Sequence, residues 1–182
     1  MKNTLKIAGI LTLFSAIIFL IPVITGNFGF LLNWWILLVL FIFVIVILII
    51  AGRKFLRNSH VPVTYGSALK DLFIAMLISS IVSLIISVGL YRNNEEMRQS
   101  HYEFSVESAV GSLETLMGWA GESESAIEIE KDKFMNDDKG LQDIKDNYPY
   151  TWSKLPLGLL NSIFMGLIYC LIAAIFVKEK ID

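Results

Sequence analysis

The sequence has one cysteine, Cys170, and two histidines, His60 and His101, among its 182 residues. A single cysteine excludes a disulfide within the chain and the paired-cysteine spacings of zinc sites. The chain also lacks the HExxH, GxSxG, P-loop and dinucleotide-binding motifs of common enzyme families. These absences favour a protein that is not an enzyme, and they leave no catalytic, cofactor-binding or metal-binding residue to assign.

Charged residues are missing from four long apolar segments. The whole chain is 55% hydrophobic, with a mean hydropathy of +0.63, which is typical of membrane proteins. A helix needs about 20 apolar residues to cross the hydrocarbon core, and a backbone in lipid must satisfy its own hydrogen bonds. The sequence therefore predicts an all-α fold, with residues 1–182 as a single four-helix membrane domain. The predicted spans are 7–24, 31–51, 72–90 and 155–177.

Basic residues in the short connecting segments set the orientation. Lys2 and Lys6 precede the first span, the segment 52–71 between the second and third spans is basic, and the loop 25–30 is uncharged. The positive-inside rule then places both termini in the cytoplasm and residues 92–154 on the extracytoplasmic side. The first span also resembles a signal peptide, but its length and the lack of an Ala-x-Ala site favour its retention. Six aromatic residues fall at the predicted outer interface: Trp34, Trp35, Tyr91, Tyr148, Tyr150 and Trp152.

The segment 92–154 is acidic and not of low complexity. Between Arg92 and Leu155 there are 14 acidic residues and seven Lys or Arg, a net charge of −7. Helical spacing of apolar residues predicts an amphipathic helix, and Ser125 with Glu128 predicts a capping box at the start of a second. Residues 136–140 favour a turn. We expect two or three short helices, the first either separate or continuous with the third span. The apolar stripe of the first helix consists of Val106, Val110, Leu113 and Met117.

That stripe has two interpretations. It could dock a partner protein of the cell envelope, or it could pack on its own neighbours or on the membrane surface, which is the commoner outcome. Nucleic-acid binding has no support, because the basic residues are few and flank the membrane spans.

Isolated polar residues offer little chemistry. Asp71, at the inner end of the third span, is interpreted as an interfacial acid or as a residue favoured by the helix dipole. Asn33 and Asn161 are expected to bond a neighbouring helix or water, and His60 stands alone in a loop. The acids Asp137, Asp138, Asp143 and Asp146 do not have the spacing of a calcium loop.

Small residues recur at every fourth position in two of the spans. Lipid gives no hydrophobic force between helices, so helices associate through close packing, which small side chains permit. A spacing of four keeps them on one face of a helix. We predict a helix-packing seam that consists of Ala75, Ser79, Ser83 and Ser87 in the third span and of Gly158, Ser162, Gly166, Cys170 and Ala174 in the fourth.

The antiparallel orientation of these two spans suggests a register for the seam. If residues at equal depth in the membrane face each other, the pairs are Ser87 with Gly158, Ser83 with Ser162, Ser79 with Gly166, and Ala75 with Cys170. Cysteines at 83 and 162 are then expected to crosslink, whereas cysteines at 81 and 164 are not. A homo-oligomer contact through one stripe is the alternative. The second span has no Gly, Ala, Ser or Thr from Ile36 to Ile50, so we expect it to be the most exposed to lipid.

The layout resembles a domain-of-unknown-function family of four-span bacterial inner-membrane proteins with an acidic insert between spans three and four. The resembling stretches are VTYGSALKDLFIAMLISSIVSLIISVGLY, MGWAGESESAIEIEKDKF and PLGLLNSIFMGLIYCLIAAIFVKEK. The resemblance covers nearly the full chain and implies an integral membrane protein of the bacterial inner membrane. It implies no activity and no catalytic residues.

The function expected from these features is that of a non-enzymatic envelope scaffold or accessory subunit that docks a partner through the segment 92–154. The alternative is a small oligomeric transporter or channel-like protein with a water path lined by Ser79, Ser83, Ser87 and Asn161. An enzyme would instead require an outer cleft that gathers acids such as Glu103, Glu107 and Glu114. The lipid bilayer is the one partner that the composition itself implies.

Overall fold

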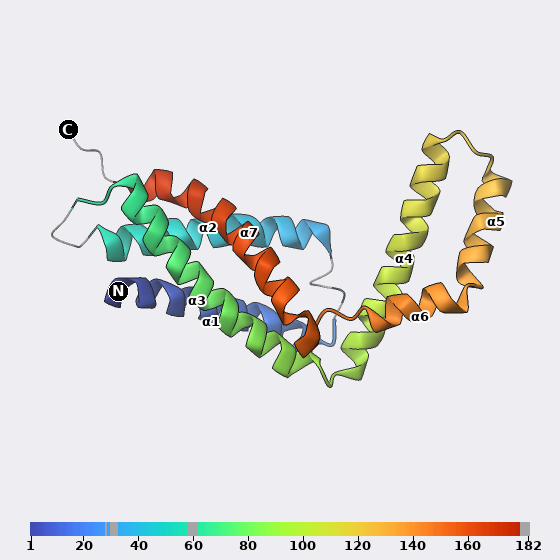
Figure 1. Ribbon diagram of the computed structural model, residues 1–182, viewed down its shortest axis with the longest axis horizontal. Helices are drawn as coiled ribbons and strands as arrows, with labels where there is room; N and C mark the ends of the chain where they lie inside the picture. Colours follow the sequence, from blue (N-terminus) through green and yellow to red (C-terminus); the bar gives the residue numbers. More distant parts are fainter. Residues whose placement is uncertain (28, 30–32, 58–61, 179–182) are drawn as a thin grey trace. The chain divides into compact units, whose positions relative to one another are not determined.

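The computed structural model of the chain describes residues 1–27, 29, 33–57 and 62–178 (Figure 1). The regular structure in these residues is helical, without strands, which confirms the all-α prediction. The chain divides into two compact units. We call Met1–Arg92 together with Tyr150–Asp182 the membrane unit, and Asn93–Pro149 the insert unit.

Four long helices build the membrane unit. They are α1 (Lys2–Thr25), α2 (Trp34–Leu56), α3 (Tyr65–Tyr91) and α7 (Leu155–Val177). Each is long and apolar enough to cross a membrane, as the sequence predicts. The helices α1 and α3 begin several residues before the predicted spans, because hydropathy marks the lipid-crossing part of a helix whereas backbone hydrogen bonding continues into polar residues. The linker residue His60 lies outside the described residues.

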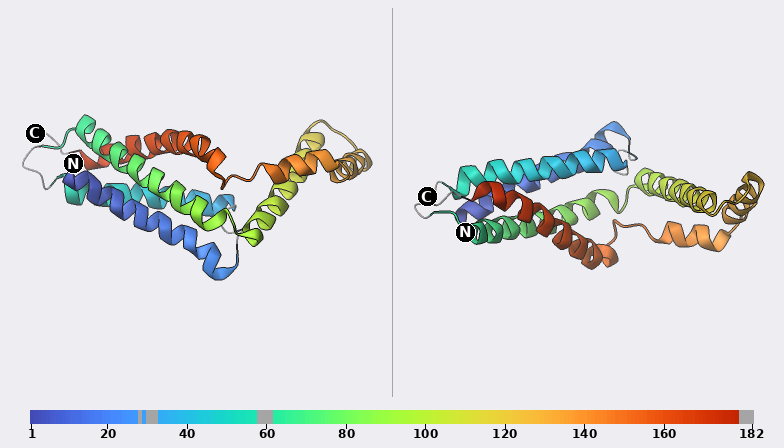
Figure 2. Two further views of the ribbon diagram at one scale, coloured as in Figure 1. Left: turned by 60° about the horizontal axis from the view of Figure 1, so that its bottom comes forward. Right: turned by 90° about the horizontal axis from the view of Figure 1, so that it is seen from above.

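The four helices are arranged in a ring. The helices α1 and α7 each contact both α2 and α3, and the contact of α3 with α7 is the most extensive in the molecule (Figure 2). Successive helices run in opposite directions, so α1 begins and α7 ends at the same end of the bundle (Figure 1). We call this the terminal end.

The hydrophobic core of the membrane unit lies toward the terminal end. Small residues allow the helices to approach closely there, and a methyl group at Gly52 of α2 would lie 2.7 Å from a methyl carbon of Val177 in α7. The core residues come from the first half of α1 and α3 and the last third of α2 and α7, with Val63 from the linker. They are Ile7, Ala8, Leu11, Leu48, Ala51, Leu56, Val63, Ala68, Leu72, Ala75, Cys170, Ala173, Ala174 and Val177.

Two arginines of α2 cap the carboxyl end of α7. The Arg57 Nε donates to the carbonyl of Val177 at 2.8 Å, and its Nη2 donates to the carbonyls of Phe176 at 3.0 Å and Lys178 at 2.7 Å. The Arg53 Nε donates to the carbonyl of Phe176 at 2.9 Å. The last carbonyls of a helix have no partner within the helix. These arginines therefore have a structural role, which the count of basic residues used to predict membrane orientation does not reveal.

The exposed fractions of the helices agree with a lipid environment. Within the most apolar stretch of each helix, 17% of α2 is buried, compared with 39% of α3. This confirms that the second span is the least packed of the four. Trp34 and Trp35 are 58% and 60% exposed, whereas Tyr91 and Tyr148 are buried. The position of the aromatic residues at the outer interface stays a prediction.

Tyr91 is buried because it joins three segments of the membrane unit. Its hydroxyl donates to the carbonyl of Phe19 in α1. Its ring packs edge-on against Phe19 at a centroid distance of 6.0 Å and against Tyr150 at 4.8 Å. A tyrosine at the last position of α3 therefore links α3 to α1 and to the segment that leads into α7.

The insert unit contains α4 (Glu95–Trp119), α5 (Glu124–Met135) and α6 (Asp138–Asp146), and α4 contacts both of the others. The first helix is separate from α3, since the Asn94 side chain accepts a hydrogen bond from the backbone of Met97 at 2.8 Å and caps a new helix. Gly121, with a φ of +77°, follows α4 in the left-handed conformation that glycine tolerates best.

Two local predictions for the insert are wrong. The cap of α5 is Ser123, whose hydroxyl accepts from the backbone N–H of Ala126 at 3.3 Å, and Ser125 lies inside the first turn. The predicted turn at 136–140 is confined to its first two residues, because α6 already begins at Asp138. Ser123 and Ser125 are both candidates for the N-cap of α5, and the sequence spacing of a capping box does not decide between them.

Candidate functional site

One face of α4 in the insert unit is left without a neighbour. We call it the docking face. A shallow groove with a volume of about 460 Å³ runs along it. At the end of this groove, Trp119 is 82% exposed and Leu116 is 63% exposed. The docking face consists of Ser108, Gly111, Ser112, Thr115, Leu116 and Trp119.

The hydroxyl groups of the docking face are turned back into their own helix. The Thr115 hydroxyl donates to the carbonyl of Gly111 and the Ser112 hydroxyl donates to the carbonyl of Ser108, both at 2.8 Å. Each hydroxyl has a single proton to donate, so the face presents mainly carbon atoms and no free hydroxyl donor at these two positions. A methyl group at Gly111 would meet nothing within 4 Å. The face is therefore narrow, open and largely apolar.

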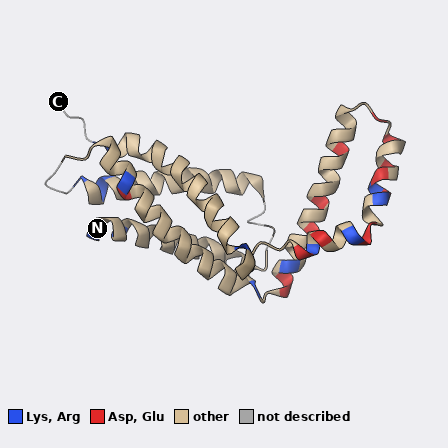
Figure 3. Ribbon diagram, viewed as in Figure 1, with Lys and Arg blue, Asp and Glu red and all other residues tan. Residues whose placement is uncertain are grey.

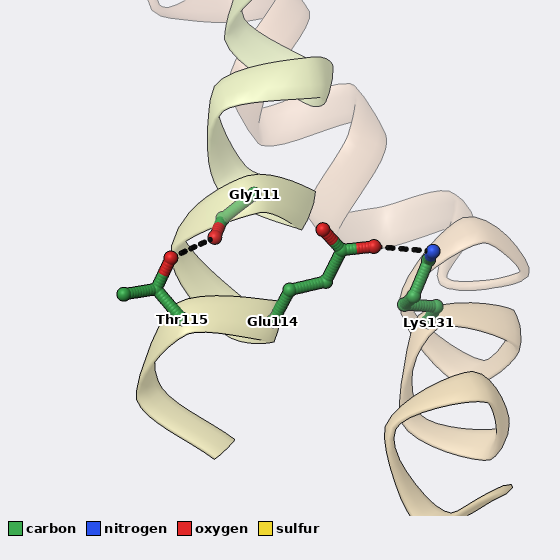
Figure 4. A network of polar contacts seen from close by, with 4 residues as sticks. All are labelled: Gly111, Glu114, Thr115 and Lys131. Carbon is green, nitrogen blue, oxygen red and sulfur yellow. Dashed lines mark hydrogen bonds and ion pairs between the residues drawn. The ribbon is translucent and has the colours of Figure 1, made fainter. Parts of the chain in front are cut away.

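The other side of α4 packs within the insert unit. Figure 4 shows Glu114 reaching toward α5, where its carboxylate pairs with Lys131, while Thr115 points away. This pair raises the pKa of Lys131, through the hydrogen bond first and the attraction of the charges second. The predicted apolar stripe (Val106, Val110, Leu113 and Met117) is partly buried. Packing on neighbours thus accounts for the stripe, and a different face of α4 is left exposed.

The docking face carries a sequence signal that the sequence analysis did not use. Ser108 and Ser112 are four positions apart, as are Gly111 and Thr115, which is the same spacing that predicts the helix-packing seam. The spacing is easily noticed in the apolar spans and less so in a polar segment. In a polar segment the same pattern marks a helix face on which backbone lies close to the surface.

His101 lies on α4 near the segment that follows α6. Its ring packs edge-on against Tyr148 at a centroid distance of 5.6 Å, and Ser105 Oγ lies 3.4 Å from its Nδ1. Partial burial lowers the pKa of His101, so the ring is neutral at neutral pH. No catalytic partner accompanies it in these contacts, and its role is packing within the insert unit.

Acidic residues predominate in the insert unit, which carries the docking face (Figure 3). From Gln99 to Glu130 the chain has seven acidic residues and no lysine or arginine. The first basic residues beyond this stretch, Lys131 and Lys133, pair with Glu114 and Glu130. The other five acids of the stretch form no ion pair within the described part of the chain: Glu103, Glu107, Glu122, Glu124 and Glu128. Glu107 and Glu122 flank the docking face along the chain, whereas Glu124 and Glu128 line a separate pocket with Lys131.

The helix-packing seam lies in the membrane unit, on the two helices with the most extensive mutual contact. On α3, all four members are buried: Ala75, Ser79, Ser83 and Ser87. On α7, Gly166, Cys170 and Ala174 are buried, whereas Gly158 and Ser162 are partly exposed. The Ser87 hydroxyl donates to its own helix at Leu84. The Ser83 hydroxyl is buried and has no hydrogen-bond partner among the described residues.

The predicted register of the seam is wrong at both of its glycines. A methyl group at Gly158 would lie 3.1 Å from Leu84, and one at Gly166 would lie 3.0 Å from Met76. Ser87 and Ser79, the predicted partners, are not within 4 Å of those positions. Large side chains lie over the glycines because two small residues facing each other would leave a void, and interiors are densely packed. The crosslink between cysteines at 83 and 162 stays a prediction.

Other polar residues considered in the sequence have structural partners. Asp71 accepts a hydrogen bond from the buried Thr4 hydroxyl at 3.1 Å, at the edge of a cavity of about 640 Å³ at the terminal end. It is the seventh residue of α3, beyond the first turn, so the dipole interpretation is wrong. Asn33 caps α2 by accepting from Trp35 at 3.0 Å, rather than bonding a neighbouring helix. Asn161 is exposed.

Glu103 and Glu114 of the insert unit lie apart from each other and have different partners. Glu103 and Glu114 are eleven residues apart on α4, about 16 Å along the axis. Glu103 accepts a hydrogen bond from Gln99 at 2.7 Å, and Glu114 is paired with Lys131. Within the described part of the chain, no group of three His, Cys, Asp or Glu side chains is placed to hold a metal ion.

Comparison with protein families gives one match, over residues 6–179, to the family described as protein of unknown function (DUF4199). The match covers nearly the whole chain, and the chain belongs to this family. Comparison with curated proteins and comparison with solved structures both give no match. With its four apolar helices, the chain is a transmembrane member of a family whose role is not established.

Proposed function

We propose that this DUF4199 protein is a non-enzymatic membrane scaffold or accessory subunit that docks a partner protein through its insert unit. The supporting observation is Trp119, which is 82% exposed at the end of an open groove on α4. Tryptophan contributes a large apolar area and is enriched among the residues that dominate binding energy at interfaces. A groove of small residues beside such an anchor is suited to a helix or an extended segment.

The proposed setting is the bacterial inner membrane, with both termini in the cytoplasm and the insert unit on the extracytoplasmic side. Basic residues flank the spans at the terminal end, and the insert is strongly acidic (Figure 3). Because Arg53 and Arg57 are also used as caps for α7, the orientation rests mainly on the lysines Lys2, Lys6, Lys54, Lys70 and Lys178.

The alternative function, a small oligomeric transporter, has less support. It requires water along Ser79, Ser83, Ser87 and Asn161. The three serines are 3%, 8% and 1% exposed, so water has little access to them in this conformation. The buried Ser83 hydroxyl without a partner is the one observation in favour of a polar path. A homo-oligomer is compatible with the scaffold role, which involves the bilayer but no cofactor and no nucleic acid.

The proposal is tested by purifying the full-length protein with its partners in mild detergent. The double variant Leu116→Ala, Trp119→Ala removes both large anchors of the docking face and should lose a partner that the wild type retains. Ile129→Ala is the matched control, since Ile129 is a 56% exposed apolar residue on α5 of the same unit, outside the docking face.

The orientation of the protein in the membrane is tested by treating intact cells with a membrane-impermeant amine crosslinker before the protein is purified. The crosslinker should reach the insert lysines, such as Lys133, which is exposed. An equal set of partners in the wild type and the double variant contradicts the docking role. Protection of the insert lysines in intact cells contradicts the proposed orientation.

A further inference from the structure

The kind of partner follows from the charge around the docking face. Seven acids and no lysine or arginine lie between Gln99 and Glu130, and His101 in that stretch is neutral at neutral pH because burial lowers its pKa. Charged groups arranged around an interface favour partners of opposite sign and suppress partners of the same sign. A binding surface in this field selects a cationic partner.

The shape of the docking face narrows the choice further. A methyl group at Gly111 would meet nothing within 4 Å, and Figure 4 shows Thr115 directed away from α5. Ser112, Thr115 and Trp119 on this side are exposed. Small residues allow a second helix to approach closer than the usual 8–10 Å between axes. Leu116 and Trp119 then close one end of the groove with exposed apolar surface. This is the arrangement by which a groove holds the apolar side of an amphipathic helix.

We propose that the docking face binds a cationic amphipathic helix of a partner protein, with its apolar side on Gly111 and Trp119 and its lysines or arginines toward the surrounding glutamates. This inference rests on the proposed docking function and adds the chemistry of the partner. Glu107 and Glu122, which flank the docking face along the chain and form no ion pair within the described part of the chain, are available to the cationic side chains. An arginine of the partner also finds the exposed face of the Trp119 ring, a favourable cation–π site.

Two other occupants fit the charge less well. A second copy of the chain carries the same excess of acids around its own docking face, so self-pairing brings like charges together. An anionic lipid surface repels the same glutamates and attracts basic segments instead. Trp119 could still enter a neutral lipid interface, and the experiment separates that outcome from the others.

The experiment uses the full-length protein in zwitterionic nanodiscs and a fluorescently labelled synthetic peptide, an amphipathic helix with a leucine side and a lysine–arginine side. Binding is measured by anisotropy. A peptide with the same residues in a non-amphipathic order and one with glutamate in place of the basic residues are the probes for shape and charge. We expect the first peptide to bind at least about tenfold more tightly than either control peptide, with an affinity that falls as salt is raised.

Variants then locate the site. Trp119→Ala, which removes the anchor, and Gly111→Leu, which fills the groove without meeting a neighbour, should each weaken binding at least about tenfold. Conversion of Glu107 and Glu122 to glutamine should weaken binding and flatten its salt dependence. Ile129→Ala should leave binding unchanged, and far-UV circular dichroism confirms that each variant is folded.

The outcomes distinguish this inference from the function on which it rests. The inference is overturned if the glutamate peptide binds equally well, if Gly111→Leu has no effect, or if no peptide binds. The docking function still stands in those cases if a partner co-purifies with the wild type and is lost from the Trp119 variant. Concentration-dependent dimers abolished by Gly111→Leu identify a second copy as the occupant and overturn it. Binding of the nanodisc-embedded protein to separate lipid vesicles through Trp119, without peptide binding, identifies a membrane surface and overturns it as well.

Discussion

Gly52 provides the sharpest test of how the membrane unit is held together. Alanine at this position places a methyl carbon 2.7 Å and 3.2 Å from the two γ-carbons of Val177 and 3.3 Å from a δ-carbon of Leu72. Both neighbours are fully buried. Rotation of the valine about χ1 can place its Cβ hydrogen at the nearest position, but valine in a helix strongly prefers one rotamer. If that rotamer is kept, α2 and α7 must move apart to relieve the overlap.

The size of the effect follows from that movement. Restoring an ordinary contact requires a separation of roughly 0.7 Å, and inserting a methylene-sized group into a packed core costs about 1–3 kcal/mol. The same movement stretches the hydrogen bond from Arg53 to the Phe176 carbonyl, now 2.9 Å, beyond useful length. Glycine in a helix interior is itself less favourable than alanine by about 0.5–1 kcal/mol. We therefore expect a net destabilisation of about 1–2 kcal/mol for Gly52→Ala.

The assay is reversible unfolding in mixed micelles of mild detergent and dodecyl sulfate, followed by far-UV circular dichroism. Gly9→Ala in α1 is the matched control, because a methyl group at Gly9 meets nothing within 4 Å. In the double variant Gly52→Ala, Val177→Ala the two costs should be less than additive, since the smaller residue at 177 removes the overlap. Equal stability of Gly52→Ala and Gly9→Ala, or strict additivity in the double variant, refutes the close contact.

Two further predictions concern single side chains. Arg57→Gln removes the guanidinium that donates hydrogen bonds to three carbonyls at the end of α7, and it should destabilise the membrane unit by about 1.5–3 kcal/mol in the same assay. Arg57→Lys should recover little of this stability, because an ammonium group does not reproduce the planar donor arrangement of the guanidinium. Full recovery of stability by lysine contradicts the capping role. His101 has a lowered pKa when folded, so the unfolded chain takes up its proton first as pH falls. The stability that neutral His101 contributes is therefore complete above its unfolded pKa of about 6.5 and is lost between that value and the lower folded pKa. His101→Gln should show a smaller loss of thermal stability from pH 7.5 to pH 5.5 than the wild type; an identical loss contradicts the assignment.

Much of the membrane unit could be predicted from the sequence, because lipid imposes simple demands. A run of apolar residues without charge must be a helix in a bilayer, so the spans follow from length and composition. The lack of small residues from Ile36 to Ile50 correctly predicts that α2 is the least buried helix. The contacts of individual side chains could not be predicted in the same way. Leu84 and Met76 lie over the seam glycines, and spacing alone does not show which large residue fills a gap.

The docking face shows a different limit. A stripe of apolar residues at helical spacing attracts notice in an otherwise polar segment, but burial follows from what each face meets in the fold. The partly buried stripe includes Val110, whereas Leu116 and Trp119 on the other face are exposed. Whether a tryptophan at the end of a helix is covered depends on contacts across the helical hairpin, such as the pair of Glu114 with Lys131. Those contacts depend on the turn at Gly121, and composition does not determine them.

The two ends of the membrane unit are held by different means. At the terminal end, close helix contacts at Gly52 and the arginine caps on α7 reinforce each other, because both depend on the same distance between α2 and α7. Toward the other end, an apolar groove of about 380 Å³ separates side chains of α1 and α2, among them Phe14, Trp35 and Phe43. Local stability follows the density of buried contacts. The terminal end is therefore the rigid base of the unit, and movement of α2 relative to α1 is easiest at the end where the groove lies.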